Sequence, residues 1–171
     1  AVLHLLAVAR EAGIRFRIDD FDRISRRTPV LANLKPWGLY TGPEMFEAGG
    51  MPLVAKELLK AGKIHGDQLT VSGRTIGAEA RRAKAKKGQQ VIVSARKPLK
   101  KTGGIAILRG SLAPDGCVIK LSGQEKSIHE GPARVFNREE DAFAAVKKGR
   151  IKPNDVIIIR YEGPRGGPGM R

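Results

Sequence analysis

The sequence predicts a mixed α/β fold, and three kinds of pattern support this prediction. Apolar residues recur at helical spacing in several segments, including residues 1–13 and 52–61. Two short apolar runs bounded by glycine, in residues 103–110 and 116–123, are typical of strands. From residue 134 to residue 160 a strand pattern, a helix pattern and a second strand pattern follow one another, which indicates two strands joined by a crossover helix.

The first two helices have recognisable ends. The opening helix ends at Gly13, because glycine readily adopts the left-handed conformation that ends a helix. A second helix is expected to begin at Asp19 or Asp20, where carboxylates favour a helix N-terminus, and to end before Pro29. The three aspartates Asp19, Asp20 and Asp22 could hold a metal ion, but their spacing fits no calcium loop, so a role at the helix N-terminus is the simpler interpretation.

A third helix and a fourth follow in the middle of the chain. Pro52 suits the first turn of a helix over 52–61, within which Glu57 can pair with Lys60. Residues 68–71 are expected to form a short strand, and the segment SGRTIGAEARRAKAKKG is expected to turn into a basic helix.

The composition changes between about residues 81 and 102. Two basic runs, RRAKAKKG and ARKPLKK, flank one short apolar strand pattern, QVIVS, at residues 90–94. Strand patterns dominate beyond this point, with the turn-forming stretch SLAPD between the first two. We therefore divide the chain into an N-terminal domain, a basic linker and a second domain, with the bounds 1–84, 85–102 and 103–171.

The last strand–helix–strand segment has clear local signals. Residues 134–136 form its first strand, Asn137 can cap the helix, and Glu140 completes a capping box. Gly149 ends the helix. The second strand, residues 156–160, is too apolar to be half exposed, so we expect it to be buried.

The charge of the chain raises a first hypothesis about function. The 171 residues include 32 Lys and Arg against 17 Asp and Glu, a formal net charge of +15, so a polyanion such as nucleic acid is one candidate partner. The basic runs lack interleaved aromatic residues, because the whole chain has one Trp, two Tyr and five Phe. A solvated basic surface explains these runs more simply, so nucleic acid is an unlikely partner.

The single cysteine limits the possible chemistry. Cys117 cannot form an intrachain disulfide, and one thiolate does not make a multi-cysteine zinc site. Cys117 follows Gly116 in a strand pattern, where a buried, small apolar role is expected. No run of about 18 apolar residues predicts a membrane span. A cytoplasmic location fits these observations best.

The glycine-rich stretch GPRGGPG follows the last strand, at the strand end where α/β proteins bind ligands. Its two prolines do not fit a dinucleotide fingerprint or a P-loop. A ligand-facing loop and a structural turn both remain possible. Glu162, beside it, could act as a general base or a metal ligand, although a hydrogen bond that tethers the loop is the simpler role.

Several blocks of sequence, in order, carry a family resemblance across nearly the whole chain. They are AVLHLLAVAREAG, DFDRISRRTPVLANLKPWG, AGGMPLVAKELLKAGKIHGDQLTVSGRT, KKTGGIAILRGSLAPDGCVIKLSG and GPARVFNREEDAFAAVKKGRIKPNDVIIIRYEGPRGGPGMR. Together they resemble consecutive blocks of the dihydroxy-acid dehydratase family, which also includes sugar-acid dehydratases. RGSLAPDGCVIK and RYEGPRGGPGMR are more similar to the dihydroxy-acid branch.

The resemblance implies a hydro-lyase that converts 2,3-dihydroxy acids to 2-keto acids in valine and isoleucine biosynthesis. Such enzymes use an iron–sulfur cluster as Lewis acid together with Mg²⁺, and a homodimer is the family's expected assembly. The implied architecture is the tail of an α/β cluster-binding domain followed by the first part of a swivelling β/β/α barrel. A sugar-acid dehydratase of the same family and a nucleic-acid-binding protein remain the alternatives. The preferred dihydroxy acid and the number of cluster irons stay open.

The resemblance also implies where the catalytic groups lie. The family's cluster cysteines would precede Ala1, while a metal-binding glutamate and a serine base would follow Arg171. We therefore expect an internal fragment that has no catalytic or metal-binding residue of its own and is inactive alone. The residues expected near the substrate are Thr102, Gly103, Gly104, Glu162, Gly163, Gly166 and Gly167.

Overall fold

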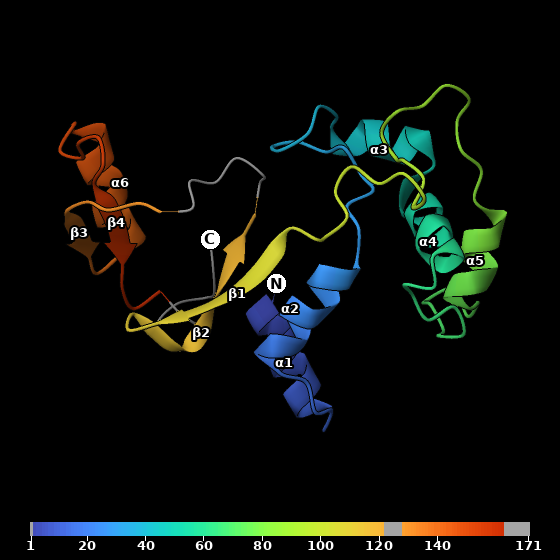
Figure 1. Cartoon of the computed structure of the whole chain (residues 1–171), viewed down its shortest axis with the longest axis horizontal. Helices are drawn as coiled ribbons and strands as arrows, with labels where there is room; N and C mark the ends of the chain where they lie inside the picture. The colour runs from blue at the N-terminus through green and yellow to red at the C-terminus, as the bar shows by residue number, and fades with distance from the viewer. Residues whose placement is uncertain (1, 122–127, 163–171) are drawn as a thin grey trace. The chain divides into compact units, whose positions relative to one another are not determined.

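The computed structural model describes residues 2–121 and 128–162, which form a mixed α/β structure in two compact units (Figure 1). The units, residues 1–123 and 124–171, are described separately. The first contains α1 (Val2–Glu11), α2 (Ile18–Arg27), α3 (Gly42–Ala48), α4 (Gly50–Lys60), α5 (Ile76–Arg82), β1 (Ile105–Gly110) and β2 (Ala113–Lys120). The second contains β3 (Ala133–Phe136), α6 (Glu139–Lys147) and β4 (Val156–Ile159).

Helices α1 and α2 form where the sequence predicts them. Gly13, which follows α1, has the left-handed φ of 68° that ends the helix. Helix α2 begins at Ile18, slightly earlier than predicted, because the carboxylate of Asp20 accepts a 2.7 Å hydrogen bond from the backbone N–H of Arg17. Asp20 thus caps the helix from its third position, while Arg17 occupies the N-cap.

Helix α3 is missing from the sequence prediction, although its signal is present. Both the backbone N–H and the hydroxyl of Thr41 donate to the Glu44 carboxylate, at 2.7 and 2.8 Å. This is a capping-box arrangement, and Pro43 stands in the first turn of the helix. Helix α4 follows after Gly49 and begins two residues before the predicted Pro52.

The core of the first unit joins α3 and α4 to the segment that follows α5. Two of its buried residues, Val91 and Ile92, come from the predicted strand at 90–94, which forms only a single bridge between Ile92 and Ala32. The predicted strand at 68–71 is likewise reduced to a bridge between Leu69 and Thr75. A strand needs an extended partner along its length, and each of these segments has one for only a few residues. The core cluster consists of Ala48, Leu53, Ala83, Val91 and Ile92.

Strands β1 and β2 form an antiparallel hairpin, in which Ile105 lies opposite Lys120. The turn is Ser111–Leu112, shorter than the predicted SLAPD, because β2 already starts at Ala113. Cys117 lies on β2 and is exposed, so the expectation that it is buried is wrong. A two-stranded hairpin has two faces, and the side chain of Cys117 lies on a solvent-exposed face.

In the second unit, β3 and β4 pair in parallel and α6 connects them, as the sequence predicts. Gly149, with a φ of 63°, ends α6. Arg138, rather than Asn137, occupies the N-cap position. The Asn137 side-chain oxygen is engaged elsewhere, accepting a 2.7 Å hydrogen bond from the guanidinium of Arg160.

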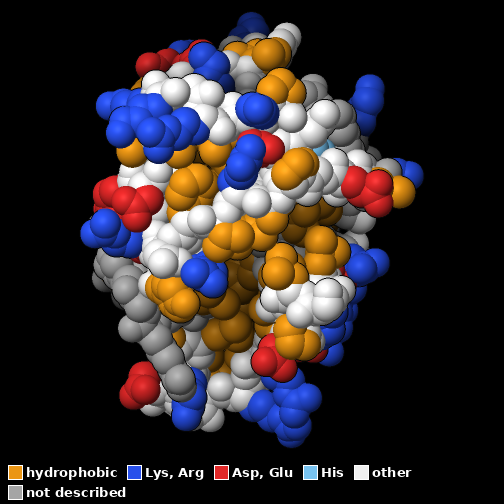
Figure 2. All heavy atoms as spheres, turned by 90° about the vertical axis from the view of Figure 1, so that its left-hand side faces the viewer, with side chains coloured by type: hydrophobic (Ala, Val, Ile, Leu, Met, Phe, Trp, Pro, Cys, Tyr) orange, Lys and Arg blue, Asp and Glu red, His pale blue; other side chains and the backbone are white. Residues whose placement is uncertain are grey.

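Strand β4 is only half buried, which corrects the prediction of a fully buried strand. Ile157 and Ile159 are 43% and 41% exposed, and they alternate with the more buried Val156 and Ile158. Helix α6 contacts both strands, so one face of the small sheet is covered while the other is accessible. Figure 2 shows one face of the whole molecule, on which hydrophobic side chains gather in patches. Lys and Arg side chains surround these patches, and a smaller number of Asp and Glu side chains lie between them. In the described part of the chain, no helix has the length and apolar character needed to cross a bilayer.

Candidate functional site

The segment Thr102–Gly104 lies just before β1 and is held between α2 and the end of β2. The backbone N–H of Gly103 donates to the carbonyl of Ser25 at 2.7 Å, and the carbonyl of Gly104 accepts from the N–H of Leu121 at 2.7 Å. A Cβ at Gly103 would lie 2.6 Å from Ser25 Oγ and 3.1 Å from Ser25 O. The close approach of two backbones therefore requires glycine at position 103. Thr102 is exposed.

Helix α2 supplies the polar groups around this segment. The Oδ1 atom of Asp22 accepts from the backbone N–H of Ile107 at 3.3 Å, and its Oδ2 atom accepts from Arg26 Nε at 2.6 Å. The hydrogen bond from Arg26 holds the pKa of the Asp22 carboxyl below its usual range; desolvation opposes this effect, and the N–H of Ile107 adds to it. Asp22 is therefore a charged acceptor at neutral pH.

Glu162 belongs to the second unit and tethers the chain after β4 to the start of α6. Its Oε1 atom accepts from the backbone N–H of Glu139 at 3.2 Å, which places a carboxylate at the positive end of the helix. This is the tethering role that the sequence suggested as the simpler one. The other predicted residues of this loop, Gly163, Gly166 and Gly167, lie outside the described residues.

Glu57 is a buried carboxylate that the sequence does not single out beyond its expected pairing with Lys60. Its Oε1 atom lies 2.6 Å from Lys60 Nζ, which confirms that pair, and its Oε2 atom accepts from the backbone N–H of Ala95 at 3.2 Å. Burial tends to raise the pKa of Glu57, but the hydrogen bonds from Lys60, the Ala95 N–H and Ser94 outweigh it and lower the pKa. Glu57 thus joins α4 to the segment after the first basic run.

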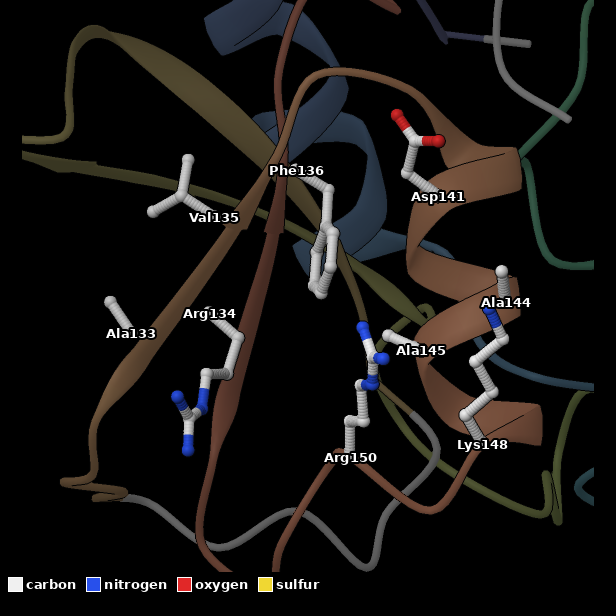
Figure 3. Close-up of a pocket in the computed structure, with 9 residues that line it drawn as sticks. All are labelled: Ala133, Arg134, Val135, Phe136, Asp141, Ala144, Ala145, Lys148 and Arg150. Atoms are coloured by element: carbon white, nitrogen blue, oxygen red, sulfur yellow. The ribbon is translucent and has the colours of Figure 1, made fainter.

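A cavity of about 590 Å³ lies between β3 and α6 in the second unit (Figure 3). The side chains of Phe136 and Arg150 extend into the space between the strand and the helix in this view. Among the described residues, Thr102, Gly103, Gly104 and Glu162 do not line this cavity. Its lining consists of Ala133, Arg134, Val135, Phe136, Asp141, Ala144, Ala145, Lys148 and Arg150.

The described residues do not form a metal centre by themselves. Over residues 2–121 and 128–162, no three His, Cys, Asp or Glu side chains come together in a way that could hold a metal ion. Cys117 is exposed on β2 and is the single cysteine of the chain. Iron–sulfur clusters are held by several cysteine thiolates, so these residues do not fit such a cluster on their own.

Comparison with known proteins identifies the class to which this α/β chain belongs. A family model for the N-terminal part of dihydroxy-acid/6-phosphogluconate dehydratases matches residues 1–79, and a model for the C-terminal part matches residues 90–171. The chain therefore belongs to the dihydroxy-acid/6-phosphogluconate dehydratase family.

Individual relatives agree with this assignment. The chain is 54% identical over 171 residues to a dihydroxy-acid dehydratase of Thermus thermophilus, and 55% identical over 171 residues to one of Roseiflexus castenholzii. A dihydroxy-acid dehydratase of Sulfurisphaera tokodaii is 51% identical over 173 residues. These matches cover 99–100% of the chain, which spans 31% of the length of each of these relatives.

Proposed function

We propose that the polypeptide containing this chain is a dihydroxy-acid dehydratase, which removes water from 2,3-dihydroxy carboxylic acids. The observation that carries the proposal is the match, in order along one chain, to both parts of a single dehydratase family, with relatives of that name above 50% identity. The reaction breaks the C2–H and C3–O bonds and releases water. The resulting enol takes up a proton at C3 and becomes a 2-keto acid, which would serve valine and isoleucine biosynthesis.

Within such an enzyme, this chain supplies scaffold and the approach to the active site. Residues 1–84 are the tail of a cluster-binding α/β domain, residues 85–102 are a linker, and residues 103–171 are the first part of a swivelling β/β/α barrel. The family models support this division, because their matched ranges end at residue 79 and resume at residue 90. The β1–β2 hairpin then opens the second domain.

The proposed cofactors are an iron–sulfur cluster and Mg²⁺, whose donors come from outside the described residues. Hydroxide is a poor leaving group, so the chemistry that such a metal centre would supply, when bound, is Lewis-acid stabilisation of the departing hydroxide. The chain's own contribution is to place Thr102, Gly103 and Gly104 near the substrate, together with Glu162 and the loop glycines Gly163, Gly166 and Gly167. We further propose a cytoplasmic homodimer.

A sugar-acid dehydratase is the second candidate function, because the matched family model also names 6-phosphogluconate dehydratase. The two candidates differ in substrate. Dihydroxy-acid dehydratases act on short branched acids, whereas the alternative acts on polyhydroxylated sugar acids. The names of the relatives favour the first.

The test is a comparison of substrates with the polypeptide encoded by the whole reading frame that contains these 171 residues. This protein, reconstituted with iron, sulfide and Mg²⁺, is expected to form 2-keto acid from 2,3-dihydroxyisovalerate. Its kcat/KM for this substrate should be at least roughly tenfold above that for gluconate or 6-phosphogluconate. A pocket for apolar groups and a pocket for hydroxyl groups differ by such factors or more in their preference for the two kinds of substrate. The 171-residue chain, treated identically, is expected to show no turnover. A preference for the sugar acids, or turnover by the short chain, would contradict the proposal.

A further inference from the structure

Helix α2 contacts β1 through a regularly spaced set of polar side chains. Asp19, Asp22 and Ser25 are three residues apart, so they lie on one face of the helix. Each meets a different position along the segment from Gly103 to Arg109. The contacts are Asp19 Oδ1 to Arg109 Nη2 at 2.7 Å, Asp22 Oδ1 to Ile107 N at 3.3 Å, Ser25 Oγ to Ile105 N at 3.3 Å, and Ser25 O to Gly103 N at 2.7 Å.

These contacts occupy one edge of the hairpin. The other edge of β1 pairs with β2, and backbone groups of alternate residues point to opposite sides of a strand. The amides of Gly103, Ile105 and Ile107 therefore point toward α2, where oxygen atoms of Ser25 and Asp22 accept them. An edge strand with free amides can pair with another chain. Here α2 accepts the amides instead, through the backbone carbonyl of Ser25 and the side chains of Ser25 and Asp22.

The same contacts join the two parts of the family. Helix α2 lies within the range matched by the N-terminal family model, and β1 lies within the range matched by the C-terminal model. Next to α2, the backbone of Val30 pairs with Lys100 as an antiparallel bridge, with a 2.9 Å hydrogen bond from Val30 N to Lys100 O. The α2–β1 contact is thus the end of a longer junction between the two parts.

We infer that Asp22 and Ser25 are positioning residues, which set the location of the Thr102–Gly104 segment relative to the N-terminal part of the enzyme. The inference rests on the proposed function, because it assumes that this segment lies near the substrate. Two features favour a fixed register. Gly103 packs closely against α2, since a Cβ at this position would lie 2.6 Å from Ser25 Oγ. The acceptors also match the amides one by one, so a one-residue slip would leave each acceptor without its donor.

The experiment uses four variants of the complete reconstituted protein. Ser25→Ala removes the acceptor for Ile105, and Asp22→Ala removes the acceptor for Ile107. Asp22→Asn keeps a side-chain oxygen for Ile107 and serves as the conservative rescue. The matched control is Arg23→Ala, because Arg23 lies on the same helix and pairs with Asp20, not with β1.

Two measurements are made on each variant. In amide hydrogen exchange, Ile105 should exchange roughly fivefold faster in Ser25→Ala, and Ile107 roughly fivefold faster in Asp22→Ala, the factor that corresponds to one lost hydrogen bond. Asp22→Asn and Arg23→Ala should leave both rates within about twofold of wild type. In steady-state kinetics, kcat/KM for 2,3-dihydroxyisovalerate should fall about tenfold or more in the two alanine variants, because small misplacements of groups around a substrate are costly. Asp22→Asn should restore most of it.

The outcomes test the proposed function and the positioning role of Asp22 and Ser25 separately. A wild-type protein without turnover would overturn the proposed function, whatever the exchange rates. If the wild type is active and the exchange rates change but kcat/KM does not, Asp22 and Ser25 are structural only and the inference is wrong. Unchanged exchange at Ile105 and Ile107 would show that α2 does not hold β1, which also overturns it.

Discussion

Replacement of Glu57 by alanine should destabilise the first unit, because this carboxylate connects two segments far apart in sequence. Glu57 is 8% exposed, lies on α4, and accepts a hydrogen bond from the N–H of Ala95. Its other oxygen lies 2.6 Å from Lys60 Nζ. Glu57→Ala removes these contacts and the hydrogen bond from Ser94, and it leaves the Ala95 amide without its acceptor.

The magnitude follows from these contacts. Leaving a partly buried amide unsatisfied costs about 1 kcal/mol or more. The lost side-chain methylene packing adds roughly 0.8 kcal/mol. The lost ion pair adds little, about 0.5 kcal/mol, because Lys60 is 60% exposed and regains water. The expected loss in the free energy of unfolding is therefore about 2 kcal/mol.

The assay is urea unfolding followed by the fluorescence of Trp37, which is the single tryptophan of the chain and lies in the first unit. Glu47→Ala is the matched control, since Glu47 pairs with Lys86 at 3.0 Å with both side chains more than 60% exposed. The control should lose at most about 0.5 kcal/mol. If Glu57→Ala and Glu47→Ala are equally stable, Glu57 does not act as a buried connection and the reasoning fails.

Three further predictions test the packing and the electrostatics. Leu53→Ala should cost the first unit roughly 2–5 kcal/mol in urea unfolding, because Leu53 is 5% exposed in the core; a loss below about 1 kcal/mol would contradict that placement. Gly131→Ala should destabilise the second unit by about 1–3 kcal/mol, because its Cβ would clash with the carbonyl oxygen of Asn154. Methyl NMR of Ile158 during denaturation measures this loss, and an unchanged midpoint would contradict the prediction. The N–H of Lys152 and the guanidinium of Arg134 lower the pKa of Asp155 below 3.8, although desolvation opposes them. The ionised Asp155 therefore stabilises the second unit above pH 3.8, and this stabilisation is lost as the pH falls through the lower pKa of the folded state. An acid titration should therefore show a shallower loss of stability below pH 3.8 in Asp155→Asn, and parallel curves would refute the assignment.

Local rules predicted the ends of helices well. Gly13 and Gly149 end α1 and α6 with positive φ values, because the left-handed conformation at a helix end is a property of the residue itself. The strand–helix–strand order of the second unit was also predictable, since its periodicity changes within a short span. The family resemblance depended on several blocks in the same order along the chain, because no single motif was specific enough to indicate the family.

What the sequence could not predict depends on partners distant along the chain. The segments at 68–71 and 90–94 have strand-like composition but form single bridges, because the length of a strand depends on its neighbour. Ile157 and Cys117 are exposed because the described part of each small sheet has an accessible face, which composition does not reveal. The three-residue spacing of Asp19, Asp22 and Ser25 was a visible signal, but only the structure shows which strand they contact.

The measurement that tests the proposed function most directly is product analysis of 2,3-dihydroxyisovalerate turnover in D₂O by the complete, metal-reconstituted protein. Loss of the C2 hydrogen and the C3 hydroxyl, followed by protonation of the enol, predicts a 2-keto acid with one solvent-derived deuterium at C3 in NMR and mass spectra. Absence of the keto acid, from a protein shown to carry its cluster and Mg²⁺, would contradict the dehydratase account.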